Sequence, residues 1–416
     1  MSTGKNILFI SYDGMTDPLG QSQVIPYLIG LTKCGFHFTI LSSEKPASYD
    51  RYKDQIASQL KAYSIKWYPI PYHKKPPVIS SVYDVKMLKR KARELHLKEH
   101  FDMVHTRAGV PALVGLWMKN KFGIKFMHDI REFYADSRVE GGMWNKTNFF
   151  YRLIYKFFKR KEAEELKNCD GIVCLTYVAE EIIRKSTGFK QSTPLEVIPC
   201  SVDMDLFDPG KIDAEEIAAL RRDYNLTETD CVISYLGSIG GWYLTDEMMR
   251  FCKDVSDKIV NAKFLFITPC DKEIIFRIGA SFEIPKEKII VAHAERNRVP
   301  LFLSLSQFAM FFIKPCYSKQ SSSPTKHGEI MAMGIPVITN SGVGDVAEIV
   351  LKYRAGVVLT NFSEEHFKMA ADKIGKSISH SRSEYRPAEI RNAAREYYDL
   401  KNAVKKYERI YDAVLR

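Results

Sequence analysis

The sequence KPCYSKQSSSPTKHGEIMAMGIPVITNSGVGDVAEIV, residues 314–350, indicates the fold class of the whole chain. The apolar run before it, Phe308–Ile313, predicts a buried strand. A loop rich in Ser and Lys leads into a predicted helix, with the N-cap and first helical residue at Ser323-Pro324. Gly334 ends this helix, and a second strand is predicted over residues 335–339. Strand, helix and strand in this order predict a parallel α/β sheet.

The start of this predicted helix suits a phosphate group. The first backbone N–H groups of a helix have no partner within it, and the positive end of the helix dipole lies beside them. Two lysines nearby add positive charge and three side chains add hydroxyl groups. These residues are Lys319, Ser322, Ser323, Thr325 and Lys326. Glu329, one turn into the helix, can accept two hydrogen bonds from a diol such as that of a ribose.

The segment Glu329–Val337, EIMAMGIPV, resembles the nucleotide-sugar site of retaining glycosyltransferases with the GT-B fold, of the family 4 type. That family has a Glu, then seven residues, then a second Glu in a Glu-Ala-Met-Ala-like context, followed by Gly-x-Pro-Val. The resemblance implies that Glu329 binds the ribose. The first Glu of the pattern would stand at Ser321. The carboxylate that usually holds the donor sugar therefore has no counterpart there, and the identity of the donor sugar stays open.

The resemblance implies an α/β fold of two facing Rossmann-like domains, with a cleft between them and a C-terminal helix that crosses back to the first domain. Residues 198–207, IPCSVDMDLF, resemble the family's segment at the domain junction, I-P-x-x-V-D-x-x-x-F. We therefore expect an acceptor-side domain over residues 1–205, completed by a helix over about 396–416. The nucleotide-sugar-binding domain is expected over residues 206–395.

Hydrophobic patterning supports this division, because short apolar runs alternate with helical patterns in both halves. In the first half, strands are predicted at residues 7–11, 36–41, 65–70, 103–105, 125–129, 171–175 and 195–199. In the second half, strands are predicted at residues 232–236, 264–268, 289–292 and 308–313, before the strand at 335–339.

The loop after the first predicted strand does not have the G-x-G-x-x-G pattern of a dinucleotide-binding site. The resemblance places this loop at the cleft, with Gly20 near the donor phosphates and Gln21 on the acceptor side. A plain surface turn is the alternative interpretation. An amphipathic helix is predicted to follow the loop and to run to about Lys33.

His128 stands near the end of a predicted strand, and strand ends are where ligands bind in open α/β sheets. The resemblance implies that it lies in the cleft, close to the transferred sugar. Arg131 and Arg138 follow in the next loop and are candidate acceptor-side residues. Each arginine could instead pair with a neighbouring carboxylate.

A glycine-rich loop follows the strand predicted at 232–236, and Gly237 and Gly240 would let its backbone approach a ligand closely. Many family members have Gly-Arg at this point and a Lys shortly after, both of which bind the diphosphate. Here Ser238 stands at the Arg position and the Lys has no counterpart. Backbone N–H groups, Ser238 and the two lysines named above would then bind the diphosphate.

The composition suits an anionic ligand, because 61 Lys and Arg against 50 Asp and Glu give a net charge of +11. Eight cysteines are scattered without a C-x-x-C pair, so reduced, buried thiols in a cytoplasmic protein are expected. The N-terminus lacks the pattern of a signal peptide. No uncharged run provides the ~20 apolar residues that a membrane-spanning helix needs.

Residues 149–161, FFYRLIYKFFKRK, are both basic and aromatic. One interpretation is a helix whose apolar face packs on the core. The other is docking onto an anionic membrane surface, since members of the resembling family often act on lipid-linked acceptors. The expected location is the cytoplasm, including the inner face of the plasma membrane.

The resemblance implies a retaining glycosyltransferase that moves a sugar from a nucleotide diphosphate sugar to a glycan or polyprenyl-linked acceptor, in the biosynthesis of a bacterial surface polysaccharide such as lipopolysaccharide or capsule. His128, Lys326 and Glu329 are the candidate catalytic residues. No cofactor or metal is expected, because N–H groups and lysines can stabilise the charge of a departing diphosphate. The alternatives are a nucleotide-sugar epimerase of the same fold and a non-catalytic sugar-nucleotide-binding partner protein. No nucleic acid is expected as a partner, since no module that binds one is recognised.

Overall fold

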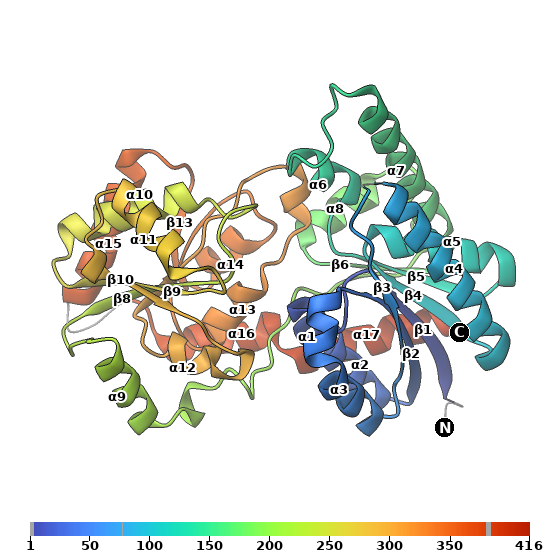
Figure 1. Cartoon of the computed structure of the whole chain (residues 1–416), viewed down its shortest axis with the longest axis horizontal. Helices are drawn as coiled ribbons and strands as arrows, with labels where there is room; N and C mark the ends of the chain where they lie inside the picture. Colours follow the sequence, from blue (N-terminus) through green and yellow to red (C-terminus); the bar gives the residue numbers. More distant parts are fainter. Residues whose placement is uncertain (1–3, 77, 380–383) are drawn as a thin grey trace. The chain divides into compact units, whose positions relative to one another are not determined.

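The computed structural model describes residues 4–76, 78–379 and 384–416. The chain forms two compact units (Figure 1). The first consists of Met1–Ser201 and Leu400–Arg416, and the second of Val202–Asp399. The second unit is therefore inserted between two parts of the first.

The first unit contains a seven-stranded parallel sheet with the strand order β3-β2-β1-β4-β5-β6-β7. Its strands are β1 Lys5–Ser11, β2 Phe36–Glu44, β3 Lys66–Pro71, β4 Met103–Arg107, β5 Lys125–Ile130, β6 Gly171–Cys174 and β7 Leu195–Val197. The strand order reverses between β1 and β4. In open α/β sheets, ligands bind beyond the carboxyl ends of the strands near such a point.

Helices cover both faces of this sheet (Figure 1). They are α1 Pro18–Gln23, α2 Ile25–Thr32, α3 Pro46–Ala62, α4 Ile79–Glu99, α5 Gly109–Phe122, α6 Tyr134–Glu140, α7 Phe149–Asn168, α8 Tyr177–Lys185 and α17 Leu400–Leu415. Alternate residues of a strand point to opposite faces. Accordingly, Ile7 and Phe9 of β1 pack with α2, α3 and α17, whereas Leu8 and Ile10 pack with α4 and α5.

Helix α17 completes the first unit. Its apolar residues, such as Ile410 and Val414, lie in the core with β1 and α2. Two of its tyrosines also reach polar side chains of the sheet: the hydroxyl of Tyr411 lies 2.6 Å from Nδ1 of His105, and that of Tyr407 donates to Asp129 at 3.0 Å. The expected return of the C-terminal helix to the first domain is confirmed.

The second unit contains a six-stranded parallel sheet with the order β10-β9-β8-β11-β12-β13. Its strands are β8 Cys231–Leu236, β9 Ala262–Ile267, β10 Ile289–Ala292, β11 Phe308–Met310, β12 Val337–Asn340 and β13 Gly356–Leu359. Its α-helices are α9 Ala214–Asp223, α10 Thr245–Lys258, α11 Lys272–Ser281, α12 Val299–Leu303, α13 Thr325–Ala332, α14 Val346–Lys352, α15 Glu364–Ser379 and α16 Pro387–Tyr398. Short 3-10 turns are η1 Pro209–Lys211, η2 Lys286–Lys288, η3 Arg296–Arg298 and η4 Tyr317–Ser321.

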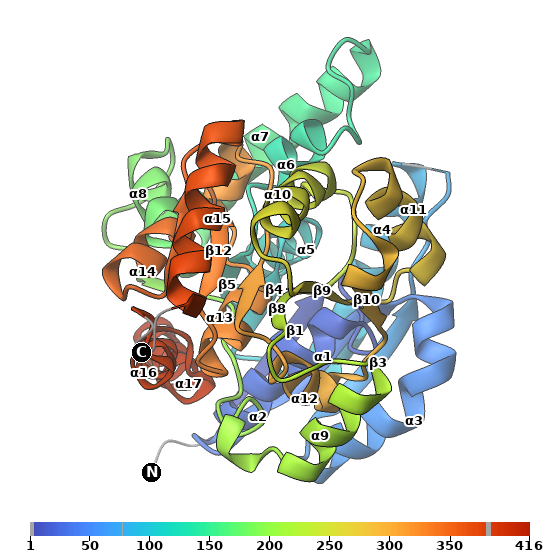
Figure 2. The same ribbon diagram turned by 90° about the vertical axis from the view of Figure 1, so that its left-hand side faces the viewer.

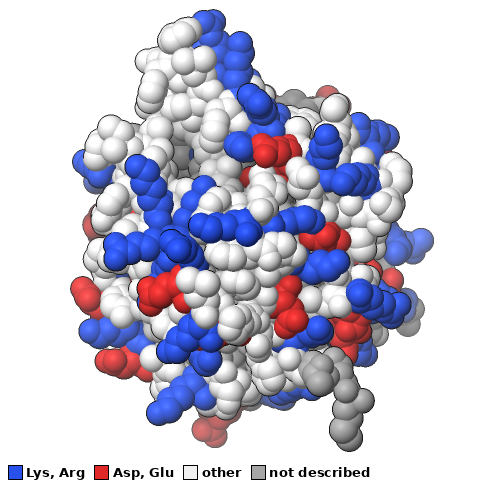
Figure 3. All heavy atoms as spheres, turned by 90° about the vertical axis from the view of Figure 1, so that its right-hand side faces the viewer, with Lys and Arg blue, Asp and Glu red and all other residues white. Residues whose placement is uncertain are grey.

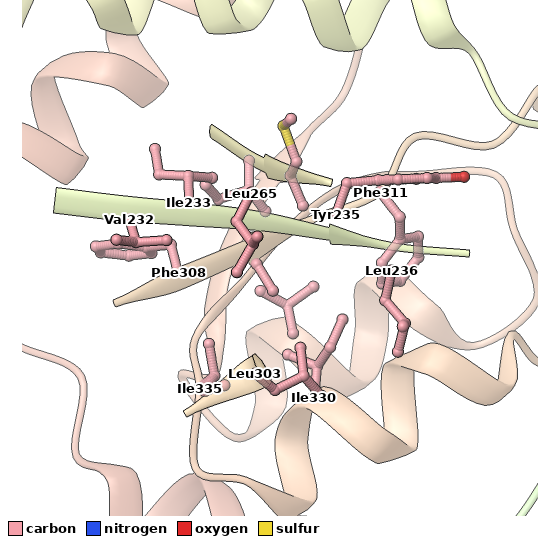
Figure 4. Packing of buried hydrophobic residues seen from close by; sticks show 14 of the residues in the cluster. Val232, Ile233, Tyr235, Leu236, Leu265, Leu303, Phe308, Phe311, Ile330 and Ile335 are labelled. Carbon is pink, nitrogen blue, oxygen red and sulfur yellow. The ribbon is translucent and has the colours of Figure 1, made fainter. Parts of the chain in front are cut away.

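This second sheet also lies between two helical layers (Figures 1 and 2). Helices α10 and α15 cover one face, and α12, α13 and α16 cover the other. Figure 4 shows how its core is filled: Ile330 of α13 and Leu303 of α12 lie on the same side of β8. Ile330 is fully buried, so the apolar side of α13 is fixed against the sheet. The polar residues near the start of α13 are thereby held in place.

Several elements differ from those expected. The single helix expected up to about Lys33 is two helices, α1 and α2, because Pro26 has no N–H with which to continue the first one. Helix α13 begins at Thr325, one residue later than predicted, with Pro324 as its N-cap. Strand β12 starts at Val337 because Pro336 cannot donate to the ladder. Strand β13 was not predicted.

The structure also bears on the thiols and on the membrane. All eight cysteines are free, but Cys34, Cys270 and Cys316 are only partly buried, so the expectation of buried thiols was wrong for these three. Within residues 4–76, 78–379 and 384–416, no helix has the length and apolar character needed to cross a bilayer. The same residues contain no group of three or more His, Cys, Asp or Glu side chains that could hold a metal ion.

Candidate functional site

The glycine-rich loop after β8 and the first turn of α13 lie together in the second unit. Gly237 has φ +120 and Gly240 has φ +78, conformations that favour glycine. A Cβ atom on Gly237 would lie 2.8 Å from Nζ of Lys326. The absence of a side chain at Gly237 therefore makes room for the lysine. Two parts of the sequence that were separately expected to bind the donor are in contact here.

Lys326 lies among aromatic rings in this position. Its amine is 3.7 Å from the ring centre of Tyr243 and 4.4 Å from that of Tyr235, and it donates to the Tyr235 hydroxyl at 3.3 Å. Burial lowers the pKa of Lys326 to about 7, and the nearby Glu329 carboxylate opposes this effect. The Tyr235 hydroxyl also donates to the carbonyl of Ser238, so one tyrosine connects the loop with the lysine.

Glu329 is buried and is held by an arginine from another element. Nη1 of Arg296, on η3, donates to Oε1 of Glu329 at 2.8 Å. Among the residues that the structure describes, Oε2 of Glu329 has no hydrogen-bond partner. One carboxylate oxygen is thus fixed and the other is available to a ligand, which suits hydrogen bonds from ribose hydroxyls.

The segment before α13 positions the other predicted donor-side residues. The Lys319 amine lies 3.8 Å from the ring centre of Trp242, and Lys319 is buried. Ser321, at the position of the family's first Glu, is buried and donates to the carbonyl of Ser318 at 2.8 Å. Three further predicted residues, Ser322, Ser323 and Thr325, are partly exposed.

In the first unit, His128 lies on β5 and is buried. Its ring stacks on that of Phe126 with centroids 5.8 Å apart. Burial lowers the pKa of His128 to about 4, against an opposing effect of Asp129. The imidazole is therefore neutral at physiological pH. Its Nδ1 atom has no hydrogen-bond partner within the described part of the chain.

The two predicted acceptor-side arginines both have carboxylate partners. Nε of Arg131 lies 3.5 Å from Oδ1 of Asp129, and the side chain of Arg131 is only 8% exposed. Burial opposes ionisation of Asp129, but Arg131 and the neighbouring His105 and Arg107 hold its pKa below the usual range. Arg138 pairs with Glu132 at 3.1 Å and is more accessible, with 29% of its side chain exposed.

Gly20 and Gln21 lie on α1, beside the loop that follows β1. Gly20 is buried, and a Cβ atom there would lie 2.1 Å from the carbonyl oxygen of Gly14, so close packing requires glycine. Gln21 donates from Nε2 to the carbonyl of Thr16 at 2.9 Å. The buried Glu44 accepts hydrogen bonds from the same loop, including one from the Thr16 hydroxyl at 2.6 Å. In this structure both predicted residues therefore help to shape the loop.

Tyr235 and Tyr243 were not among the candidate residues chosen from the sequence. The resemblance placed Arg296 only in the family's loop on the nucleobase side, and not beside Glu329. Tyr235 follows the apolar pattern of β8 and gave no separate signal. The contact between Arg296 and Glu329 joins residues 33 positions apart, which no local pattern reveals.

Comparison with known proteins gives a family and a fold. Residues 27–206 match the profile of Glycosyltransferase Family 4. A glycosyltransferase from Rickettsia africae is similar in structure, with a TM-score of 0.74, 14% identity and 99% of each chain covered. Alr3699/HepE from Anabaena in complex with UDP gives a TM-score of 0.71 and 10% identity, over 98% of this chain and 99% of that one.

WaaG, a glycosyltransferase involved in lipopolysaccharide biosynthesis, gives a TM-score of 0.67 and 14% identity, over 97% of this chain and 99% of that one. No curated protein matches the sequence significantly. The fold and the family match together define a glycosyltransferase with the GT-B fold. More particularly, the profile match to Glycosyltransferase Family 4 covers residues 27–206, which lie mostly in the first unit. The expected family, fold class and enzyme class are thus confirmed.

Proposed function

We propose that the protein transfers a sugar from a uridine diphosphate sugar, with retention of configuration, to a glycan or polyprenyl-linked acceptor. The uridine nucleotide is suggested by Alr3699/HepE, whose structures contain UDP and UDP-glucose. The proposed setting is the biosynthesis of a bacterial surface polysaccharide, such as lipopolysaccharide or capsule. WaaG, with the same fold, is involved in lipopolysaccharide biosynthesis.

The observation that supports this proposal best is the meeting of the glycine-rich loop, Lys326 and the Arg296–Glu329 pair in the second unit. In our proposal, loop N–H groups, Lys326 and Lys319 bind the diphosphate, and the open oxygen of Glu329 accepts from the ribose. These groups would stabilise the negative charge that develops on the departing diphosphate. No metal is needed for that role.

In the first unit, His128 is proposed to lie close to the transferred sugar. Because its imidazole is neutral at physiological pH, its role would be that of a hydrogen-bonding group and not of a charged one. The more accessible of the two predicted acceptor-side arginines, Arg138, is a candidate for contact with the acceptor.

The test begins with thermal shift of the purified protein in UDP-, ADP- and GDP-sugars, followed by a transfer assay with polyprenyl-linked glycans. NMR of the product gives the anomeric configuration. We expect binding of a UDP-sugar, transfer with retention, and unchanged activity in EDTA. Conversion of the UDP-sugar without an acceptor would instead indicate an epimerase. Binding without any turnover would indicate a sugar-nucleotide-binding protein, and no binding at all would overturn the proposal.

Contact with an anionic membrane is a further part of the proposed function, and helix α7 is its candidate surface. Four large apolar side chains of α7 are about half exposed or more: Phe149, Phe150, Leu153 and Phe157. Exposed basic residues alternate with them: Arg152, Lys156 and Arg160. The alternative of a core-facing helix fits Phe158, which packs on Tyr134 and Trp144, but not these four residues. Figure 3 shows this side of the first unit: basic side chains are spread over it among fewer acidic ones, and the projection at the top has an uncharged surface with basic side chains along one edge.

Flotation with vesicles that contain anionic lipid tests this part separately. The wild-type protein should float with the vesicles at low salt. It should dissociate from them as the salt concentration is raised, because salt screens the basic residues. The double variant Phe149→Asp/Phe157→Asp should not float. Leu351→Asp, which changes an exposed leucine of the second unit, is the matched control and should behave as wild type. Absence of flotation of the wild-type protein at low salt would exclude the membrane contact.

A further inference from the structure

A histidine and a buried aspartate form a pair at the carboxyl edge of the first sheet. Tyr12 directly follows β1, and one residue separates the end of β3 from His73. Asp84, in the second turn of α4, is fully buried. Its Oδ1 lies 2.6 Å from Nδ1 of His73, and its Oδ2 accepts from the Tyr12 hydroxyl at 2.7 Å and from the His73 backbone N–H at 3.2 Å.

These contacts determine what His73 offers to a ligand. A buried carboxylate needs hydrogen-bond donors, so Nδ1 of His73 carries the proton that faces Asp84. In the neutral imidazole with its proton on Nδ1, the other ring nitrogen, Nε2, is a hydrogen-bond acceptor. In the described ranges it has no hydrogen-bond partner, and the side chain of His73 is 41% exposed. The pair therefore presents one fixed acceptor atom to the solvent.

An exposed aromatic ring stands next to this acceptor. The ring of Tyr83 is nearly perpendicular to that of His73, at 86° with centroids 5.1 Å apart, and Tyr83 is 48% exposed. Val82 and Ile79, from the same turn of α4, are also exposed. A flat apolar surface beside a fixed polar atom matches a sugar ring, whose C–H face is apolar and whose edge carries hydroxyl groups.

We propose that His73 and Tyr83 form a binding subsite for a sugar ring of the acceptor. The C–H face of the sugar packs on Tyr83, and one of its hydroxyls donates to Nε2 of His73. Asp84 and Tyr12 are positioning residues, because they fix the tautomer and the orientation of the imidazole. The subsite rests on the proposed function, since only a glycosyltransferase with a glycan acceptor requires it.

The experiment uses saturation-transfer NMR of the full chain with methyl glycosides of glucose, galactose, mannose and N-acetylglucosamine as probes. We expect at least one glycoside to bind the wild-type protein. Because one hydrogen bond is lost, His73→Ala should weaken its binding about threefold to tenfold, and Tyr83→Ala should weaken it to a similar degree. Tyr63→Ala, at another exposed tyrosine of the first unit, should leave binding unchanged. Equal binding by wild type and His73→Ala, or no binding of any glycoside, would overturn the subsite.

The histidine itself gives a readout in the wild-type protein. Long-range 1H–15N correlation should show the Nδ1–H tautomer for His73, and glycoside should shift its Nε2 signal. If Asp84 fixes the tautomer of His73, Asp84→Asn should change that tautomer. If Asp84 has only a structural role, the tautomer should stay the same. An Nε2–H tautomer in the wild-type protein would contradict the proposal. UDP-glucose binding in the same samples tests the proposed function separately, because a protein that binds UDP-glucose but no glycoside disproves only the subsite.

Discussion

At the scale of single residues, the proposed donor site depends on the absence of a side chain at Gly237. The amine of Lys326 occupies the volume that a side chain on Gly237 would take. Lys326 in turn lies on two tyrosine rings, and Glu329 is directed by Arg296. Lys326 and Glu329 are thus each held by residues that do not themselves need to touch the donor.

Gly237→Ala should displace the lysine and weaken UDP-glucose binding about tenfold or more, the loss expected for a hydrogen bond to a charged group. Gly241→Ala is the matched control. Gly241 also has a positive φ, +65, but nothing lies within 4 Å of its Cβ position. Calorimetric titration of both variants separates backbone strain from displacement of Lys326. Equal affinities for the two variants would contradict this role of Gly237.

Arg296→Ala should weaken UDP binding about tenfold, because Glu329 loses the partner that orients its carboxylate. Arg296→Lys should restore part of the loss. The effect should nearly disappear with 2′,3′-dideoxy-UDP, which lacks the ribose hydroxyls that Glu329 would bind. A loss of the same size for both nucleotides would show that Arg296 acts elsewhere.

The binding of UDP-glucose should depend on pH through Lys326. The pKa of this lysine is about 7 in the unliganded protein, whereas a bound diphosphate favours the charged amine. Above about pH 7 the free protein loses a proton that the complex retains, so affinity should fall by up to about tenfold per pH unit. Titration calorimetry from about pH 6 to about pH 8.5 measures this slope. Lys326→Arg keeps its charge over this range and should abolish the pH dependence of affinity. Affinity of the wild-type protein that does not change with pH would contradict this role of Lys326.

At the scale of elements, the sequence indicated most strands and helices because their apolar runs and glycine or proline ends are local signals. Strand β13 was missed because four residues, GVVL, are too few to distinguish a strand from a buried turn. The candidate site was predictable in part. Lys326 and Glu329 could be found because both belong to one helix, α13. The contacts of Arg296, Tyr235 and Tyr243 with that helix could not be predicted, since folding alone brings these residues together.

The contribution of helix α17 to the stability of the first unit can be tested, although this helix lies far from the other elements of that unit in the sequence. Tyr411→Phe removes the hydroxyl that lies 2.6 Å from Nδ1 of His105 and leaves that buried atom unsatisfied. The variant should lower the free energy of unfolding by about 1–3 kcal/mol. Tyr63→Phe, at an exposed tyrosine, should change it by less than about 0.5 kcal/mol. Urea denaturation measures both, and equal stabilities would contradict the importance of this contact.

At the scale of the whole molecule, each of the two units has its own sheet and its own core. The residues proposed to bind the nucleotide all lie in the second unit, whereas the proposed acceptor subsite lies in the first. A ligand that binds one unit stabilises that unit by mass action.

UDP-glucose at about 100 times its dissociation constant should stabilise the second unit by about 2.7 kcal/mol. For a unit of this size, that corresponds to a rise of about 5–10 °C in its unfolding temperature. Hydrogen exchange can locate the effect: amides of β8 and α13 should gain protection, and amides of β1 and α4 should gain little. Equal protection in both units, measured at the same ligand concentration, would contradict the proposal that the nucleotide binds through residues of the second unit.

The insertion of Val202–Asp399 into the first unit has a consequence for synthesis on the ribosome. When residue 201 emerges, the first sheet is complete, but Leu400–Leu415 has not yet been translated, and the groove that this helix fills remains exposed. The inserted unit can acquire its native core before its predecessor does. The first unit therefore completes its core only after the inserted unit has been synthesised, and the apolar surface that α17 covers stays exposed on the nascent chain until then.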